Sequence, residues 1–136
     1  MIHEKRIEIR WKDLDVYGHV NNAVYLTYLE EVRDEWLGEV LGDPAEIWNY
    51  VLVRVAIDYR LELSLEDDIA VATCRLQGIG TSSVRTEERV LTVQGALAAQ
   101  AESVLVARDR DHGRSRPLTD AERAAFERAI VADVNP

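Results

Sequence analysis

The stretch from Asn22 to Leu41 is the feature that most constrains the fold of this chain. Its apolar side chains recur at the spacing of one helix face, at positions 25, 28, 29, 32, 36 and 40. Leu26 and Leu37 widen this face to about half of the helix circumference, more than a helix lying on a surface usually shows. We therefore predict a helix, capped by Asn21 or Asn22, that other elements wrap around. The side chains expected to be largely buried are Leu29, Val32 and Trp36.

Five further segments alternate apolar and polar residues at the period of a half-buried β-strand. They are Arg6–Trp11, 51–60, 69–76, 84–93 and 97–108. Asp43–Glu46 has the capping aspartate and proline of a short helical turn, and Thr119–Glu122 is a capping box that opens a C-terminal helix. Together with the long helix, these segments predict an α+β fold in which a five-stranded, mainly antiparallel sheet wraps around one central helix.

Composition narrows the class of protein. A length of 136 residues with 47% hydrophobic and 30% charged residues predicts a single globular domain over residues 1–136. A formal net charge of −9 disfavours a nucleic-acid partner. The chain shows neither a signal-peptide pattern nor an apolar run of membrane-spanning length, so we expect a cytoplasmic protein without a membrane partner. Cys74 is the only cysteine and is expected to be a small core residue.

A polar turn, residues 13–21, separates the first predicted strand from the long helix. Asp15 within it can serve as a general base or as a nucleophile toward an activated carbonyl. The helix that follows offers unpaired N–H groups and the positive end of its dipole, which can hold an oxyanion. Asp13, Asn21 and Asn22 are equally typical of structural turns and caps. His19 and one carboxylate offer too few ligands at a recognisable spacing for a metal, so no metal is expected.

Arg33 lies within the broad apolar face of the predicted helix, one turn from Glu30. An ion pair between these residues, at i and i+3, is expected to neutralise the arginine where the helix meets the sheet. The alternative is that Glu30 faces a substrate as a second acid.

The segment from Asp13 to Leu26, with Glu30 and Arg33 on the helix, resembles the signature of hotdog-fold acyl-CoA thioesterases of the 4-hydroxybenzoyl-CoA thioesterase type. Its active-site turn also resembles that of plant acyl-carrier-protein thioesterases. Three more segments occur in the same order in that superfamily: Val55–Tyr59, Gly80–Ser83 and Arg114–Pro117. The resemblance implies a hotdog fold and hydrolysis of an acyl-CoA or acyl-carrier-protein thioester to a free acid and a thiol.

The resemblance also implies roles for individual residues. Asp15 is then the catalytic carboxylate, His19 and Asn22 orient water or substrate, and backbone N–H groups near Asn21 and Asn22 polarise the thioester carbonyl. The implied substrate-binding residues are Gly18, Asn21, Tyr25, Ser82, Ser83 and Arg85. No cofactor is implied, because coenzyme A is part of the substrate. A homodimer or homotetramer with the site at the subunit boundary is expected.

Two departures from the superfamily pattern leave alternatives open. Relatives often have a proline after the second strand, where this chain reads Arg60-Leu-Glu62-Leu63, and some have basic residues where Gly80-Thr81 precede Ser82. The carrier, coenzyme A or acyl-carrier protein, therefore stays open. The same fold hosts enoyl-thioester hydratases, and a non-catalytic acyl-thioester binding module is the alternative outside the enzymes.

Overall fold

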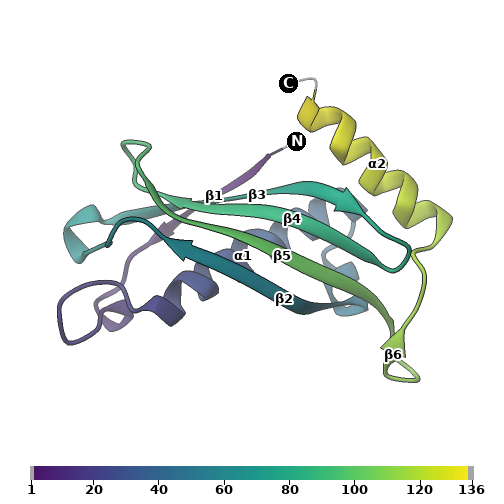
Figure 1. Cartoon of the computed structure of the whole chain (residues 1–136), viewed down its shortest axis with the longest axis horizontal. Helices are drawn as coiled ribbons and strands as arrows, with labels where there is room; N and C mark the ends of the chain where they lie inside the picture. The colour runs from purple at the N-terminus through teal and green to yellow at the C-terminus, as the bar shows by residue number, and fades with distance from the viewer. Residues whose placement is uncertain (1, 135–136) are drawn as a thin grey trace.

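The computed structural model describes the backbone of residues 2–134 and the side chains up to Ile130 (Figure 1). A long helix, α1 (Asn22–Leu41), lies against a curved antiparallel sheet with the strand order β1-β3-β4-β5-β2. The five strands are β1 (His3–Glu8), β2 (Tyr50–Tyr59), β3 (Ile69–Ile79), β4 (Ser83–Leu91) and β5 (Leu97–Asp109). A two-residue strand, β6 (Arg114–Ser115), pairs with the end of β5.

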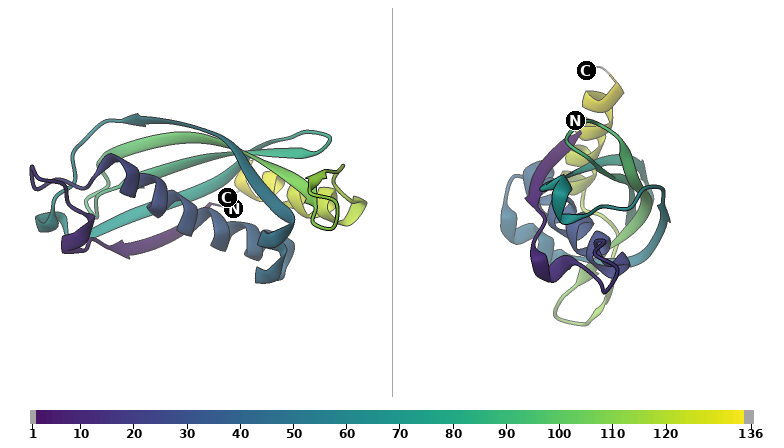
Figure 2. Two further views of the ribbon diagram at one scale, coloured as in Figure 1. Left: turned by 90° about the horizontal axis from the view of Figure 1, so that it is seen from below. Right: turned by 90° about the vertical axis from the view of Figure 1, so that its left-hand side faces the viewer.

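The sheet curls around α1, as the end-on view in Figure 2 shows. Leu29 and Val32 are fully buried and Trp36 is 1% exposed, so the expected burial of the wide helix face is confirmed. The Asn21 side chain caps the helix by accepting a hydrogen bond from the Ala23 N–H at 2.9 Å. The predicted α+β fold with one wrapped central helix is therefore confirmed.

The first strand begins earlier than the alternation of its residues predicts. It spans His3–Glu8 rather than Arg6–Trp11, and Trp11–Asp13 forms a single 3-10 turn. The Asp13 carboxylate accepts a hydrogen bond from the Arg10 backbone N–H at 3.0 Å, which takes this donor away from the sheet and turns the chain. Trp11 is consequently 80% exposed.

The expected ion pair between Glu30 and Arg33 is wrong. Glu30 is exposed, so it neither neutralises the arginine nor lies in an enclosed site. Arg33 is buried and instead donates to Glu88 of β4, with Nε 2.7 Å from Oε2 and Nη2 2.9 Å from Oε1. The sheet covers this part of α1, and Glu88 of β4 neutralises the arginine.

A second helix, α2 (Asp120–Val134), closes one end of the curled sheet. The predicted capping box is confirmed, because the Glu122 N–H donates to Thr119 Oγ1 at 3.1 Å and the Thr119 N–H donates to Glu122 Oε1 at 2.8 Å. Phe126 stacks on Trp36 of α1 with the ring centres 6.1 Å apart. Within the described chain, neither helix is long and apolar enough to cross a membrane.

Candidate active site

The polar turn lies at the end of the molecule opposite α2, beside the segment that joins β2 to β3 (Figure 1). Two isolated bridges, Leu14 with Val20 and His19 with Ser64, attach its two sides to each other and to that segment. The Val20 N–H also donates to the Leu63 carbonyl at 2.7 Å. The turn is thus held rigidly between the start of α1 and residues 61–64.

Asp15 organises the tip of this turn. Its Oδ1 accepts hydrogen bonds from the N–H groups of Tyr17 at 2.9 Å and His19 at 3.3 Å, and its carbonyl accepts from the Gly18 N–H at 3.1 Å. Gly18 has φ +81°, which favours glycine at this position. No hydrogen bond from a described residue reaches Oδ2 of Asp15, so one carboxylate oxygen remains open to water or a ligand.

Asp13 has a different environment, and the structural role expected from its turn position agrees with it. Its buried carboxylate accepts from the Arg10 guanidinium at 2.9 Å and from the Tyr28 hydroxyl at 2.8 Å. Burial disfavours the charged form, but the hydrogen bonds from Arg10 and Tyr28 outweigh it and keep the pKa of Asp13 below its ordinary value. Both carboxylate oxygens are engaged, which leaves Asp13 poorly placed for chemistry.

Some backbone N–H groups at the start of α1 already have hydrogen-bond acceptors within the protein. The Asn21 N–H donates to the Asp13 carbonyl at 2.9 Å, and the Ala23 N–H is taken by the Asn21 cap. The backbone N–H of Asn22 makes no hydrogen bond to a described residue. Asn22 is therefore the position at which the helix dipole and an available N–H coincide.

A pocket of about 480 Å³ opens beside these groups. It is lined by residues of the polar turn, the start of α1, and the end of β2 with the segment that follows it: Asp15, Tyr17, His19, Val20, Asn22, Tyr25, Tyr59, Arg60, Leu61 and Glu62. The expected residues Asp15, His19, Asn22 and Tyr25 therefore share one cavity. Gly18 and Asn21 shape its wall through the turn and the cap rather than lining it.

The end of β2 and the segment that follows it supply pocket residues that sequence reasoning did not select. The Tyr59 hydroxyl donates to the Asn22 carbonyl at 2.8 Å, and its ring meets Tyr25 edge to face at 5.2 Å. Glu62 Oε2 lies 3.3 Å from Nε2 of His19. The only sequence signal for Glu62 is its position in the turn where relatives often carry a proline.

Ser82, Ser83 and Arg85 lie at the opposite end of the sheet from this pocket. Ser83 is paired with Val106 of β5, whereas Tyr59, beside the pocket, is paired with Ala99 of the same strand. The stretch of β5 between these two points is roughly 20 Å long. One chain therefore does not bring Ser82, Ser83 and Arg85 to Asp15.

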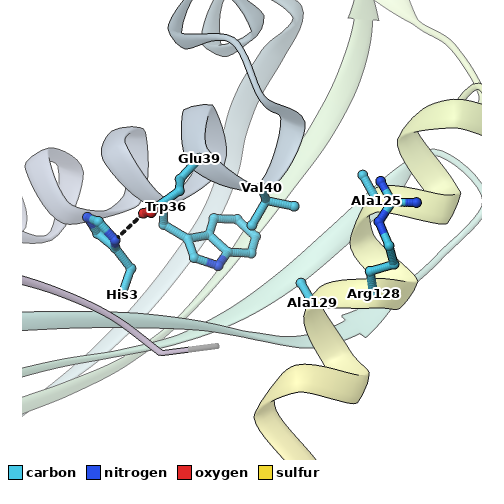
Figure 3. Close-up of a pocket in the computed structure, with 7 residues that line it drawn as sticks. All are labelled: His3, Trp36, Glu39, Val40, Ala125, Arg128 and Ala129. Atoms are coloured by element: carbon cyan, nitrogen blue, oxygen red, sulfur yellow. Dashed lines mark ion pairs between the residues drawn. The ribbon is translucent and has the colours of Figure 1, made fainter.

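A smaller pocket of about 190 Å³ lies near α2, between the last turns of α1 and the start of β1. Figure 3 shows the Trp36 ring between α2 and the ion pair of His3 with Glu39, whose Nδ1 and Oε2 are 2.7 Å apart. The Trp36 Nε1–H is buried and has no hydrogen-bond partner among the described residues. This pocket is separated from the polar turn by most of the length of α1.

The structure also bears on metal and thiol chemistry. No group of three or more His, Cys, Asp or Glu side chains within the described part of the chain is arranged to hold a metal ion. Cys74 is fully buried, as expected, and burial raises the pKa of its thiol. Its side chain belongs to the core rather than to a reactive surface.

Comparisons with known proteins agree with this architecture. A family model described as the thioesterase-like superfamily matches residues 9–126. The long-chain acyl-CoA thioesterase FadM of Escherichia coli (strain K12) is 30% identical over 132 residues, which cover 93% of this chain and 98% of FadM.

Solved structures agree as well. A thioesterase from Thermus thermophilus, crystallised with coenzyme A and Zn, is 35% identical with a TM-score of 0.84, and the match covers 98% of this chain and 96% of that one. The DHNA-CoA thioesterase of Staphylococcus aureus, only 14% identical, supports the fold alone, with a TM-score of 0.84 over 98% of this chain and 93% of that one. The chain belongs to the thioesterase-like superfamily and is a hotdog-fold thioester hydrolase.

Proposed function

We propose that this protein hydrolyses acyl-CoA thioesters and that Asp15 is the catalytic carboxylate. The observation that carries the proposal is that Oδ2 of Asp15 and the N–H of Asn22, neither of which is hydrogen-bonded to a described residue, belong to residues that line the same pocket. Asp13, the other carboxylate of the turn, has both oxygens bound to Arg10 and Tyr28. Asp15 is therefore the carboxylate of the turn that retains an oxygen for a reacting group.

Two reaction courses are compatible with this arrangement. As a general base, Asp15 takes a proton from water while the water oxygen bonds to the carbonyl carbon and the C–S bond then breaks to release the thiolate. As a nucleophile, Asp15 bonds to the carbonyl carbon and expels the thiolate, and water then hydrolyses the mixed anhydride. In both, negative charge develops on the carbonyl oxygen, where the Asn22 N–H and the helix start would stabilise it.

Coenzyme A as the carrier is supported by the relatives. FadM acts on long-chain acyl-CoA, and the Thermus thermophilus thioesterase was solved as a complex with coenzyme A. These relatives are 30% and 35% identical to this chain. The proposal therefore favours acyl-CoA over acyl-carrier protein, and coenzyme A enters as part of the substrate rather than as a cofactor.

We further propose a homodimer, or a tetramer built from such dimers, formed along the edge of β2. Within the described residues this strand pairs with β5 on one side only, and its exposed residues include Val51, Leu52 and Val53. A long apolar edge strand is normally covered or paired. Two-fold antiparallel pairing would place the Tyr59 end of one strand beside the Tyr50 end of the other. The polar turn of one subunit would then approach Ser82, Ser83 and Arg85 of its partner.

The direct test is release of free thiol from a panel of acyl-CoAs that spans short, long and aromatic acyl groups. Hydrolysis of at least one member supports the proposed function. Hydration of an enoyl-CoA without thiol release would instead indicate a hydratase, and saturable binding without turnover would indicate a binding module. Either of these two results would overturn the proposal.

A further inference from the structure

Tyr25 of α1 and Tyr59 at the end of β2 both line the candidate pocket, and their rings meet edge to face with the centres 5.2 Å apart. Tyr25 is 2% exposed, so the Tyr59 ring packs against a buried neighbour. We infer that Tyr59 is a positioning residue for hydrolysis, which holds the start of α1 in the orientation that presents the Asn22 N–H to the oxyanion. This inference deepens the proposed function and rests on it, because both concern the same site.

The two tyrosines join α1 to the end of β2 by hydrogen bonds that run in opposite directions. From α1, the Tyr25 hydroxyl donates to the Leu61 carbonyl at 3.1 Å and accepts from the Leu63 N–H at 3.1 Å. From β2, the Tyr59 hydroxyl donates to the Asn22 carbonyl at 2.8 Å. The orientation of the Tyr59 side chain is therefore set at its hydroxyl by a short hydrogen bond and at its ring by packing against Tyr25.

The backbone on both sides of the Asn22 N–H is held in place. Before it, the Asn21 N–H donates to the Asp13 carbonyl at 2.9 Å, and after it, the Ala23 N–H donates to Asn21 Oδ1 at 2.9 Å. The bond from Tyr59 to the Asn22 carbonyl is the third of these restraints, and it joins the helix start to β2. The direction of the Asn22 N–H relative to the β2 side of the pocket therefore depends on Tyr59.

The consequence for chemistry concerns the oxyanion. A donor that is already oriented stabilises the developing charge without rearrangement, and this stabilisation depends on the position of the donor. Without the Tyr59 hydroxyl, the helix start loses its bond to β2, and the Asn22 N–H is held less closely in the productive direction. The transition state is affected more than the bound substrate, because the full negative charge is present only on the tetrahedral oxyanion.

Tyr59→Phe keeps the ring and removes the hydroxyl, so the fold should persist. It is expected to lower kcat about two- to tenfold, the size of one neutral hydrogen bond, and to change KM little. Steady-state hydrolysis of the acyl-CoA that the wild type turns over fastest measures both constants. Wild-type kcat in Tyr59→Phe would overturn the inference while leaving the proposed function intact.

Tyr50→Phe is the matched control at the other end of the same strand. The Tyr50 hydroxyl donates to Glu122, and Tyr50 does not line the candidate pocket. Tyr50→Phe should therefore lower thermal stability and keep the wild-type kcat. An equal loss of kcat in Tyr50→Phe and Tyr59→Phe would show a general structural effect and overturn the inference.

Two substitutions of Asn22 test whether Tyr59 acts through the backbone N–H. Asn22→Pro removes this N–H at the first helical position, where proline is favoured, and Asn21 already has the extended conformation that precedes proline, with φ −61° and ψ 140°. Asn22→Ala is its control, because it removes the side chain and keeps the N–H. Tyr59→Phe should lower kcat in the Asn22→Ala background and have no further effect in the Asn22→Pro background. Equal losses in both backgrounds, or Asn22→Pro as active as Asn22→Ala, would overturn the inference.

Carbonyl ¹³C NMR reports the hydrogen bond without any turnover. A backbone carbonyl that accepts a hydrogen bond resonates at higher frequency than a free one. The Asn22 signal should therefore move to lower frequency in Tyr59→Phe and stay in place in Tyr50→Phe, and an unmoved signal in Tyr59→Phe would overturn the inference. Absence of turnover by the wild type on every acyl-CoA would overturn the proposed function instead, whatever the NMR result.

Discussion

Arg33 and Glu88 form an ion pair in the core between α1 and β4, with both side chains at most 5% exposed. The hydroxyls of Thr86 and Ser103 donate to the two oxygens of Glu88 at 2.9 Å and 2.7 Å. The charges are therefore paired and hydrogen-bonded at the place where the helix meets the sheet. A buried charge in this position is tolerated only while its partner is present.

Removing one member of this pair is expected to be severe. Arg33→Met leaves the Glu88 carboxylate buried without a counter-charge and should lower the free energy of unfolding by about 3–5 kcal/mol. Arg33→Met combined with Glu88→Gln should cost less, because the glutamine is neutral, its amide oxygen can accept from one of the two hydroxyls and its amide nitrogen can donate to the oxygen of the other. Urea unfolding of both variants measures this difference. A double variant as unstable as Arg33→Met would contradict it.

Asp15→Asn is expected to lower kcat about 100-fold or more, which is the size of a general-base or nucleophile contribution. The fold should persist, because the asparagine Oδ1 can still accept from the N–H groups of Tyr17 and His19. Acyl-CoA hydrolysis and circular dichroism measure the two parts of this prediction. Asp13→Asn is the comparison variant, and it should lower thermal stability through loss of charge opposite Arg10. Loss of turnover in Asp13→Asn but not in Asp15→Asn would move the catalytic role to Asp13.

Mixing subunits tests whether a site is shared between two chains. One subunit carries Asp15→Asn, and the other carries alanine at Ser82, Ser83 and Arg85. Each variant alone should be impaired at low substrate concentration. After refolding of an equal mixture, half of the dimers should be mixed and contain one intact site, which gives about one quarter of wild-type activity. Light scattering must show a dimer or larger assembly, and a fully active monomer would rule out the shared site.

Acid should destabilise the protein partly through Glu122. Burial disfavours its charged form, but hydrogen bonds from Arg116, the Thr119 N–H and the Tyr50 hydroxyl outweigh burial and lower the pKa of Glu122 to about 2. A depressed pKa in the folded state means that this stabilisation is complete above the ordinary value of 4.5 and is lost as the pH falls toward 2. The free energy of unfolding of the wild type should fall over this range.

Glu122→Gln is the control for this pH dependence. Its free energy of unfolding should be lower than that of the wild type at pH 7, and the difference between the two proteins should shrink as the pH falls from 4.5 to 2. A difference that stays constant over this range would contradict the role of Glu122. Denaturant unfolding at several pH values gives both curves.

Local patterns in the sequence suffice to predict the central helix, its covering sheet, the helix caps and the position of the candidate site. The wide apolar face from Asn22 to Leu41 requires a covering sheet, and its burial follows from that requirement alone. The caps at Asn21 and Thr119 act within three residues, so neighbouring residues suffice to predict them. The crowded turn around Asp15 places the candidate site at the helix start for the same reason, since all of its groups are close in the chain.

Tertiary structure decided the pairings between distant segments. Arg33 had a local acid within reach at Glu30, but the sheet covers that part of the helix and supplies Glu88, 55 residues away. His19 comes within 3.3 Å of Glu62 where hydrogen bonds from Val20 and Tyr25 hold the segment after β2 against the polar turn and α1. Ser82, Ser83 and Arg85 lie far from Asp15, because the register along β5 places them at the opposite end of the sheet. This distance depends on strand register and not on residue type.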